Sequence, residues 1–122
     1  MSGIMLVFIA AHLITYYLDF ENYKNKIAHI HLQGIDISQT ADGIYVGEYD
    51  AGYIYVEVSV TVSDGLVTDI CLLEHRHQRG KTAEQIVQNI ITSQRTDIDA
   101  VSGATNSSLA IEKAVENALA TN

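Results

Sequence analysis

The clearest hydrophobic pattern in the chain is a strict alternation of apolar and polar residues between Tyr53 and Ser63. Successive side chains of a β-strand point to opposite faces of the sheet, so the pattern predicts a strand of an antiparallel sheet with one buried face. The residues expected on the buried face are Ile54, Val56, Val58, Val60 and Val62. Those expected on the opposite face are Tyr55, Glu57, Ser59 and Thr61.

Two further strands are predicted on either side of this one. Residues 44–49 are rich in β-branched and aromatic side chains, and the turn-forming residues 50–52 follow them. The dipeptide Asp64-Gly65 separates the alternating segment from a third run over 66–74. Asp-Gly between two β-branched runs is a strong signal for a tight hairpin.

The periodicity changes to that of helices in the second half of the chain. Thr82 is a candidate N-cap, and a second helix is expected from about Ser107 or Ser108. Apolar residues at helical spacing follow each start: Ala83, Ile86, Val87, Ile90 and Ile91 in the first helix, and Leu109, Ile111, Val115, Ala118 and Leu119 in the second. The predicted fold class is therefore α+β, a small antiparallel sheet with helices packed on it, preceded by an N-terminal hydrophobic helix.

That N-terminal helix is expected from an almost continuous apolar run over residues 4–18. Tyr16 and Tyr17 stand where interfacial aromatic residues would lie. A helix of this length rises only about 22 Å, less than the bilayer core of about 30 Å, and His12 interrupts it. A helix buried against the domain or a partner is the alternative. We predict a membrane anchor in residues 1–20 and a folded domain in residues 21–122.

Composition and charge narrow the possible partners. The chain has 122 residues, enough for one domain, and a formal net charge of -8. This charge repels nucleic-acid backbones and anionic lipids, so nucleic-acid binding is disfavoured and any membrane attachment must be hydrophobic. The single cysteine, Cys71, lies in an apolar run and is expected to be a buried, inert thiol.

A polar segment with small residues lies between the two predicted helices. Ser102, Gly103 and Ala104 leave the backbone open to close approach, and Thr105 presents a hydroxyl near the first turn of the last helix. The unpaired N–H groups and the dipole of a helix N-terminus favour an anion such as a phosphate. Asn106, Ser107 and Ser108 add hydrogen-bond donors there. The same residue types also occur at helix starts simply as caps.

The run Asp99-Ala100-Val101-Ser102-Gly103-Ala104-Thr105 fits the pattern Asp, two variable residues, Ser or Thr, Gly, Ala, Thr. It resembles the flavinylation motif of FMN-binding domain proteins. That family includes the FMN-carrying subunits of sodium-pumping NADH:quinone oxidoreductase and of the Rnf complex. The resemblance extends from about Ile35 to the C-terminus.

The resemblance implies a cofactor, partners and a location. In the family the last threonine of the motif, here Thr105, is esterified to FMN by a separate flavin transferase that uses FAD and magnesium. Asp99 would then serve recognition or loop geometry rather than catalysis. A family member of this type is an electron-transfer component rather than a stand-alone catalyst. It is held by one anchor on the extracytoplasmic side of the cell membrane, and it serves a redox partner protein or a quinone-linked complex.

Other candidate residues carry weaker signals. The pairs His29/His31 and His75/His77 are interpreted as surface histidines rather than metal ligands, because no Cys or carboxylate stands at ligand spacing beside them. His77 could border the flavin. Four tyrosines could pack against its ring if they share a strand face: Tyr45, Tyr49, Tyr53 and Tyr55.

Two alternatives to a covalent flavoprotein stay open at this point. One is a module that binds FMN or another phosphate ligand reversibly at the same helix start. The other is a structural module without a cofactor, in which the Ser-Gly-Ala-Thr turn only caps the helix. We assign no catalytic residue, because the sequence contains no triad and no paired catalytic carboxylates.

Overall fold

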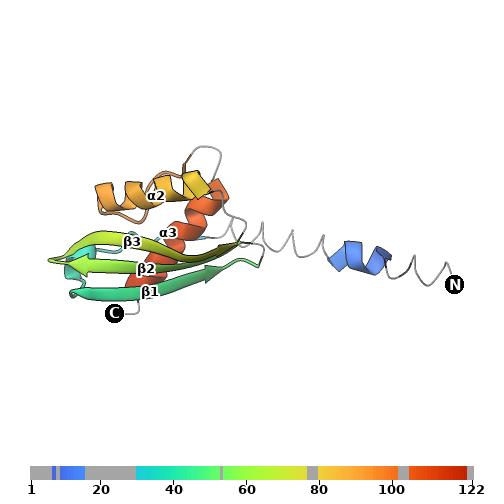
Figure 1. Cartoon of the computed structure of the whole chain (residues 1–122), viewed down its shortest axis with the longest axis horizontal. Coiled ribbons are helices and arrows are strands. Elements are labelled where there is room, and N and C mark those ends of the chain that lie inside the picture. The colour runs from blue at the N-terminus through green and yellow to red at the C-terminus, as the bar shows by residue number, and fades with distance from the viewer. Residues whose placement is uncertain are drawn as a thin grey trace.

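The computed structural model describes residues 7, 9–15, 30–52, 54–76, 80–101 and 105–120. Within this part of the chain, one antiparallel sheet with strand order β1-β2-β3 is packed against helices (Figure 1). The predicted α+β class is thus confirmed for the described residues. The elements, in chain order, are η1 (Ile37–Gln39), β1 (Gly43–Asp50), β2 (Tyr55–Ser63), β3 (Leu66–Arg76), α2 (Gly80–Ser93) and α3 (Thr105–Ala120).

The central strand β2 has the two faces that its alternation predicts. Its apolar side chains, and that of Ile54 just before it, are almost completely inaccessible to solvent, while the polar ones are partly exposed. β2 pairs with β1 on one side and with β3 on the other, and the pairing with β3 shifts register after Glu57 and after Thr61. The predicted half-buried strand is confirmed, and its apolar face forms the sheet side of the hydrophobic core.

The hairpin predicted at Asp64-Gly65 is also confirmed. Both residues have positive φ, 53° and 73°, as a two-residue type I′ turn requires. Ser63 pairs directly with Leu66 across the turn. The Asp64 N–H donates to the Asp42 carboxylate at 2.8 Å, which holds the turn beside the start of β1.

The third strand differs from expectation at Cys71, whose predicted burial is wrong. Cys71 pairs with Ser59 on the polar face of the sheet and is exposed. Its neighbour Ile70 faces the core. In a one-sided sheet an apolar run still alternates between faces, so the apolar neighbours of Cys71 did not indicate its burial.

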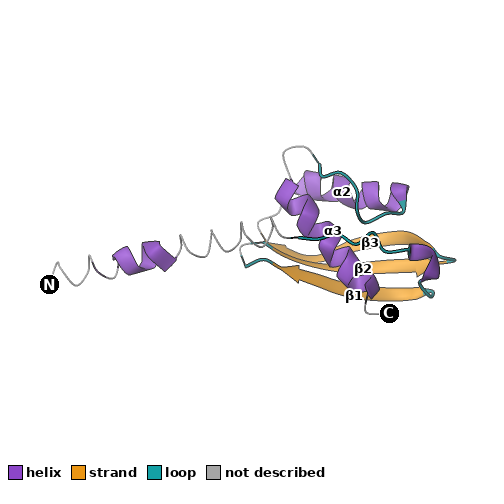
Figure 2. Ribbon diagram, turned by 180° about the vertical axis from the view of Figure 1, so that it is seen from behind, coloured by secondary structure: helices purple, strands orange, loops and turns teal. Residues whose placement is uncertain are grey.

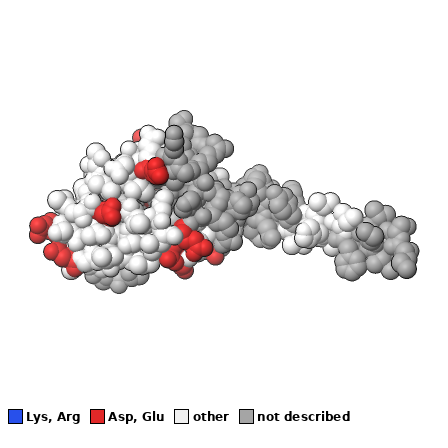
Figure 3. Space-filling model, viewed as in Figure 1, with Lys and Arg blue, Asp and Glu red and all other residues white. Residues whose placement is uncertain are grey.

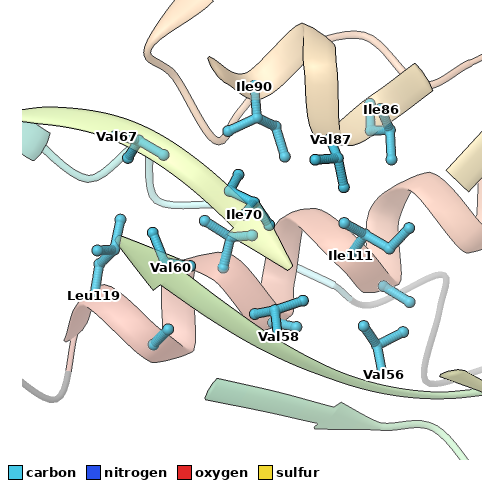
Figure 4. Packing of buried hydrophobic residues seen from close by; sticks show 14 of the residues in the cluster. Val56, Val58, Val60, Val67, Ile70, Ile86, Val87, Ile90, Ile111 and Leu119 are labelled. Carbon is cyan, nitrogen blue, oxygen red and sulfur yellow. The ribbon is translucent and has the colours of Figure 1, made fainter. Parts of the chain in front are cut away.

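The helices cover the other face of the sheet. Figure 2 shows α3 crossing that face, with α2 beside it. Both helices begin earlier than predicted: α2 at Gly80 rather than after Thr82, and α3 at Thr105 rather than near Ser107. Valines and isoleucines of the strands and both helices meet between these layers (Figure 4). The core therefore lies entirely on one side of the sheet.

The backbone of α3 approaches the sheet closely at Gly47 in β1. A Cβ on this residue would lie 2.6 Å from Ala118 Cα and still nearer to Ala118 N and Ala114 O. Asn117 Nδ2 also donates to the Glu48 carbonyl oxygen at 2.8 Å, so a side chain of α3 satisfies the edge of β1. The absence of a side chain at Gly47 thus sets the distance between helix and sheet.

The opposite edge of the sheet is satisfied by Gln94, which follows α2. Its Oε1 accepts from the Val67 N–H at 2.7 Å, and its Nε2 donates to the Val67 carbonyl oxygen at 2.8 Å. Gln94 has a φ of 57°, which ends the helix and turns the amide toward β3. One side chain thereby pairs with β3 in the way that a neighbouring strand would.

Near the N-terminus, the described residues 9–15 are helical. Val7, Ile9, Leu13 and Ile14 are all more than half exposed, and none belongs to the core. No helix among the described residues has the length and apolar character that crossing a bilayer requires. The rest of the predicted anchor lies outside the described residues.

Candidate functional site

Thr105, the residue expected to carry a ligand, is the first residue of α3 and is exposed. Asn106 is exposed beside it, whereas Ser107 and Ser108 are buried. The first turn of α3 contains no acidic side chain. N–H groups in a first helical turn lack partners within the helix and, together with the helix dipole, favour an anion. The hydroxyl-bearing residue therefore stands at a position suited to a phosphate.

A hydrogen bond joins the motif to the first turns of α3 that follow it. The Val101 N–H donates to Ser108 Oγ at 3.0 Å in a buried position. The sequence suggested Ser108 as a donor to the ligand; in the structure its oxygen accepts from the chain itself. Ser102, Gly103 and Ala104 lie outside the described residues. The bond between Val101 and Ser108 fixes where the chain enters and leaves this segment.

Ser108 is one of three buried polar residues spaced four apart on α3, which we call the polar stripe: Ser108, Glu112 and Glu116. Residues four apart lie on the same face of a helix. Glu116 is 1% exposed and accepts four hydrogen bonds of 2.7–3.0 Å from three donors. The donors are the N–H groups of Gln33 and Gly34 and the Thr96 hydroxyl. Glu116 thus holds both the segment before η1 and the loop after α2 against α3.

Glu112, the middle member of the polar stripe, has no such partners. Its side chain is completely buried, and neither carboxylate oxygen has a hydrogen bond to the described residues. Burial, followed by the negative charges of Glu116, Asp97 and Asp99, raises the pKa of Glu112 from its ordinary 4.5 to about 8. Glu112 is therefore predominantly neutral at pH 7.

The loop between α2 and α3 is acidic where it approaches the motif. Asp99 is exposed, and Asp97 accepts two hydrogen bonds of 3.0 Å from Arg95. The bond from Arg95 lowers the pKa of Asp97. On the face drawn in Figure 3, the charged side chains of the described residues are all acidic. That face is the open side of the sheet, seen with α3 behind the strands.

The four tyrosines do not form one cluster, so the hypothesis that they share a strand face is wrong. Tyr45 and Tyr49 of β1 pack against the core. Tyr55 of β2 points to the opposite face, where its hydroxyl donates to Glu48 at 2.7 Å. This bond raises the pKa of Tyr55. Tyr53 lies outside the described residues. The turn between β1 and β2 does not bring these residues onto the same face.

His31 is the only member of the two histidine pairs whose side chain lies within the described residues. His31 is exposed, and its carbonyl oxygen accepts from Lys113 Nζ at 3.1 Å. His29, His77 and the side chain of His75 lie outside the described residues, so the placement of His77 beside a flavin stays a prediction. No group of three potential metal ligands occurs among the residues that are described.

Sequence reasoning missed Glu112 and Glu116. Charged residues on a helix usually indicate its solvated face, so the sequence assigns no role to either residue. The available signal was their four-residue spacing from Ser108, which places all three on one stripe. That spacing could not show that the α2–α3 loop covers the stripe.

Comparison with known proteins identifies one family. The family model described as "FMN-binding domain" matches residues 51–120, more than half of the chain. The matched region begins after β1 and includes β2, β3, α2, the Ser-Gly-Ala-Thr segment and α3. A search of curated proteins finds no significant match. On the basis of this family match, the chain belongs to the FMN-binding domain family.

Proposed function

We propose that the protein carries FMN covalently, through a phosphodiester to Thr105 Oγ, and uses it as an electron carrier. The observation that supports this most is the exposed Thr105 at the first residue of a sixteen-residue helix, at the end of a motif that resembles the flavinylation motif. When bound, FMN supplies the redox chemistry. The chain contributes the attachment oxygen and the surroundings of the phosphate.

The residues present fit a covalently held phosphate better than a free one. The first turn of α3 contains only neutral polar side chains, and its N–H groups and dipole favour negative charge. No Lys or Arg precedes Lys113 on α3, and in the preceding loop Asp97 is paired with Arg95 while Asp99 is exposed. A phosphodiester carries one charge rather than two and cannot dissociate. Covalent attachment would therefore retain FMN without positively charged side chains on the first turns of α3.

The proposal includes partners and a location. A flavin transferase would form the bond, so the domain itself would need no base to activate the Thr105 hydroxyl. A redox partner protein or a quinone-linked complex would exchange electrons with the domain. Residues 1–20 would hold it at the extracytoplasmic side of the cell membrane, through exposed apolar side chains such as Leu13 and Ile14.

The attachment is tested by intact mass under denaturing conditions, on protein produced with a flavin transferase. We expect a mass increase equal to FMN minus one water, and reversible loss of visible flavin absorption on reduction. Thr105→Ala should lack the increase completely, because no oxygen is left to esterify. Thr92→Ala removes an exposed threonine of α2 and should be modified like the wild type.

Three other outcomes would contradict this assignment. Flavin that copurifies but separates on denaturation would favour a reversible binding module. A colourless, unmodified protein would favour a module without a cofactor. Modification that persists in Thr105→Ala would place the bond at another residue.

Membrane attachment is tested by flotation of the full chain with vesicles of neutral phosphatidylcholine. We expect flotation that is insensitive to salt, since the apolar residues near the N-terminus, and not charge, would mediate binding. Leu13→Asp should weaken binding at least tenfold, because a carboxylate would have to enter the apolar layer. Ile44→Asp, on the equally exposed polar face of the sheet, is the matched control. An equal loss in both variants, or no flotation of the wild type, would contradict the anchor.

A further inference from the structure

The polar stripe of α3 has different partners along its length. At its N-terminal end, Ser108 accepts from the Val101 N–H. At its C-terminal end, Glu116 Oε2 accepts from the Thr96 hydroxyl at 2.7 Å. The α2–α3 loop, residues 95–101, is thus attached to α3 at both of its ends. Glu112 lies between these attachments, fully buried and with no hydrogen bond to the described residues.

The charged groups around Glu112 are mostly of its own sign. Glu116 faces it from α3, and Asp97 and Asp99 face it from the α2–α3 loop. The nearby positive charges are directed elsewhere: Lys113 Nζ lies 3.7 Å from Glu116 Oε1, and Arg95 is paired with Asp97. A neutral carboxyl without partners costs less free energy in such a place than an unpaired buried carboxylate does. Ionised Glu112 would also repel the two aspartates of the loop.

We propose that Glu112 is a protonation switch: its neutral carboxyl allows the α2–α3 loop to stay packed on α3, and loss of its proton releases that loop. The loop leads directly into Ser102 and the residues before Thr105, so its release changes how the attachment residue is presented. The switch resides in the polypeptide and does not require a flavin. It can therefore be tested independently of the function proposed above.

The direction of the pH dependence follows from the two states of Glu112. With the loop packed, its pKa is about 8; with the loop released, water restores its ordinary 4.5. Between these values the packed state binds one proton more than the released state. The stabilisation is fully present below the lower pKa and is lost as pH rises through the higher one. The equilibrium constant for release should rise about tenfold per pH unit from about pH 5 to about pH 8, then level off.

Native-state amide hydrogen exchange measures this release at Val101, whose N–H is bonded to Ser108. We expect its protection factor to fall about tenfold per pH unit over that range in the wild-type chain. Glu112→Gln cannot ionise and should show a flat profile. Glu84→Gln, which alters an exposed glutamate of α2, should behave like the wild type. Val58, in the central strand, should stay at least tenfold better protected than Val101.

A second measurement requires no variant. In a carbon-13 NMR titration the Glu112 carboxyl should titrate near pH 8. Titration near its ordinary 4.5 would overturn the proposal, as would a pH-dependent slope that persists in Glu112→Gln. Equal protection of Val101 and Val58 at every pH would also overturn it, because the loop would then open only when the whole domain unfolds.

Discussion

Replacing Gly47 with valine is expected to destabilise the domain by about 3 kcal/mol or more. The new Cβ would enter the space of the α3 backbone at Ala114 and Ala118 rather than that of a flexible side chain. The helix would have to move away from β1, and this movement would separate the buried layer of Figure 4. Urea denaturation followed by circular dichroism measures the loss.

Val46→Ala is the matched control for this variant. Val46 is the neighbouring residue of β1, points to the opposite face and is 56% exposed. Its replacement should cost less than about 1 kcal/mol, since only β-propensity and an exposed contact change. Similar losses in the two variants would mean that the close approach of α3 to Gly47 does not determine the packing of the helix.

The second large effect is expected for Glu116→Gln, which keeps the shape of the side chain but replaces one oxygen with an NH₂ group. The two oxygens of Glu116 now accept from Gln33, Gly34 and Thr96, and a second donor at this position would face one of these donors. Buried hydrogen bonds to a charged group contribute about 1.5–3 kcal/mol each, and a donor without an acceptor adds its desolvation cost. We expect a loss of about 3 kcal/mol in the free energy of unfolding.

Urea denaturation again measures this loss, with Glu84→Gln as the control. Glu84 is exposed on α2, so the same chemical change there should leave stability within about 0.5 kcal/mol. Amide exchange at Gln33 and Gly34 should also accelerate in Glu116→Gln, because their N–H groups lose their acceptors. Unchanged exchange at both residues would show that another group retains the segment before η1.

The local elements were largely predictable because local rules determine them. The alternation along β2, the Asp64-Gly65 turn and the apolar positions Ile86, Val87 and Ile90 of α2 all appear as predicted. The starts of the helices were less accurate. The residues that begin α2 and α3 are small or polar and are not part of the helical spacing of apolar residues. The starts predicted from that spacing therefore lie too late in the chain.

The sequence also indicated Thr105 as the candidate site for FMN, since a short motif of small and hydroxyl residues before a helix is visible in the chain itself. It did not indicate that the Ser108 oxygen accepts from Val101, or that Tyr45 and Tyr55 occupy opposite faces. Both facts depend on how separate segments approach one another.

The sequence by itself determined the strand and helix types, the hairpin and the presence of the Ser-Gly-Ala-Thr motif, because each depends on residues within a few positions of one another. Only the tertiary structure decided the packing, exposure and hydrogen bonding of four residues: Gly47, Cys71, Glu112 and Glu116. A glycine becomes indispensable when a helix crosses it, and a thiol is exposed when its strand register points it outward. A glutamate becomes a neutral buried acid or an anchoring acceptor according to the segment that covers it. That segment is far away in sequence, so no local pattern could distinguish the two glutamates.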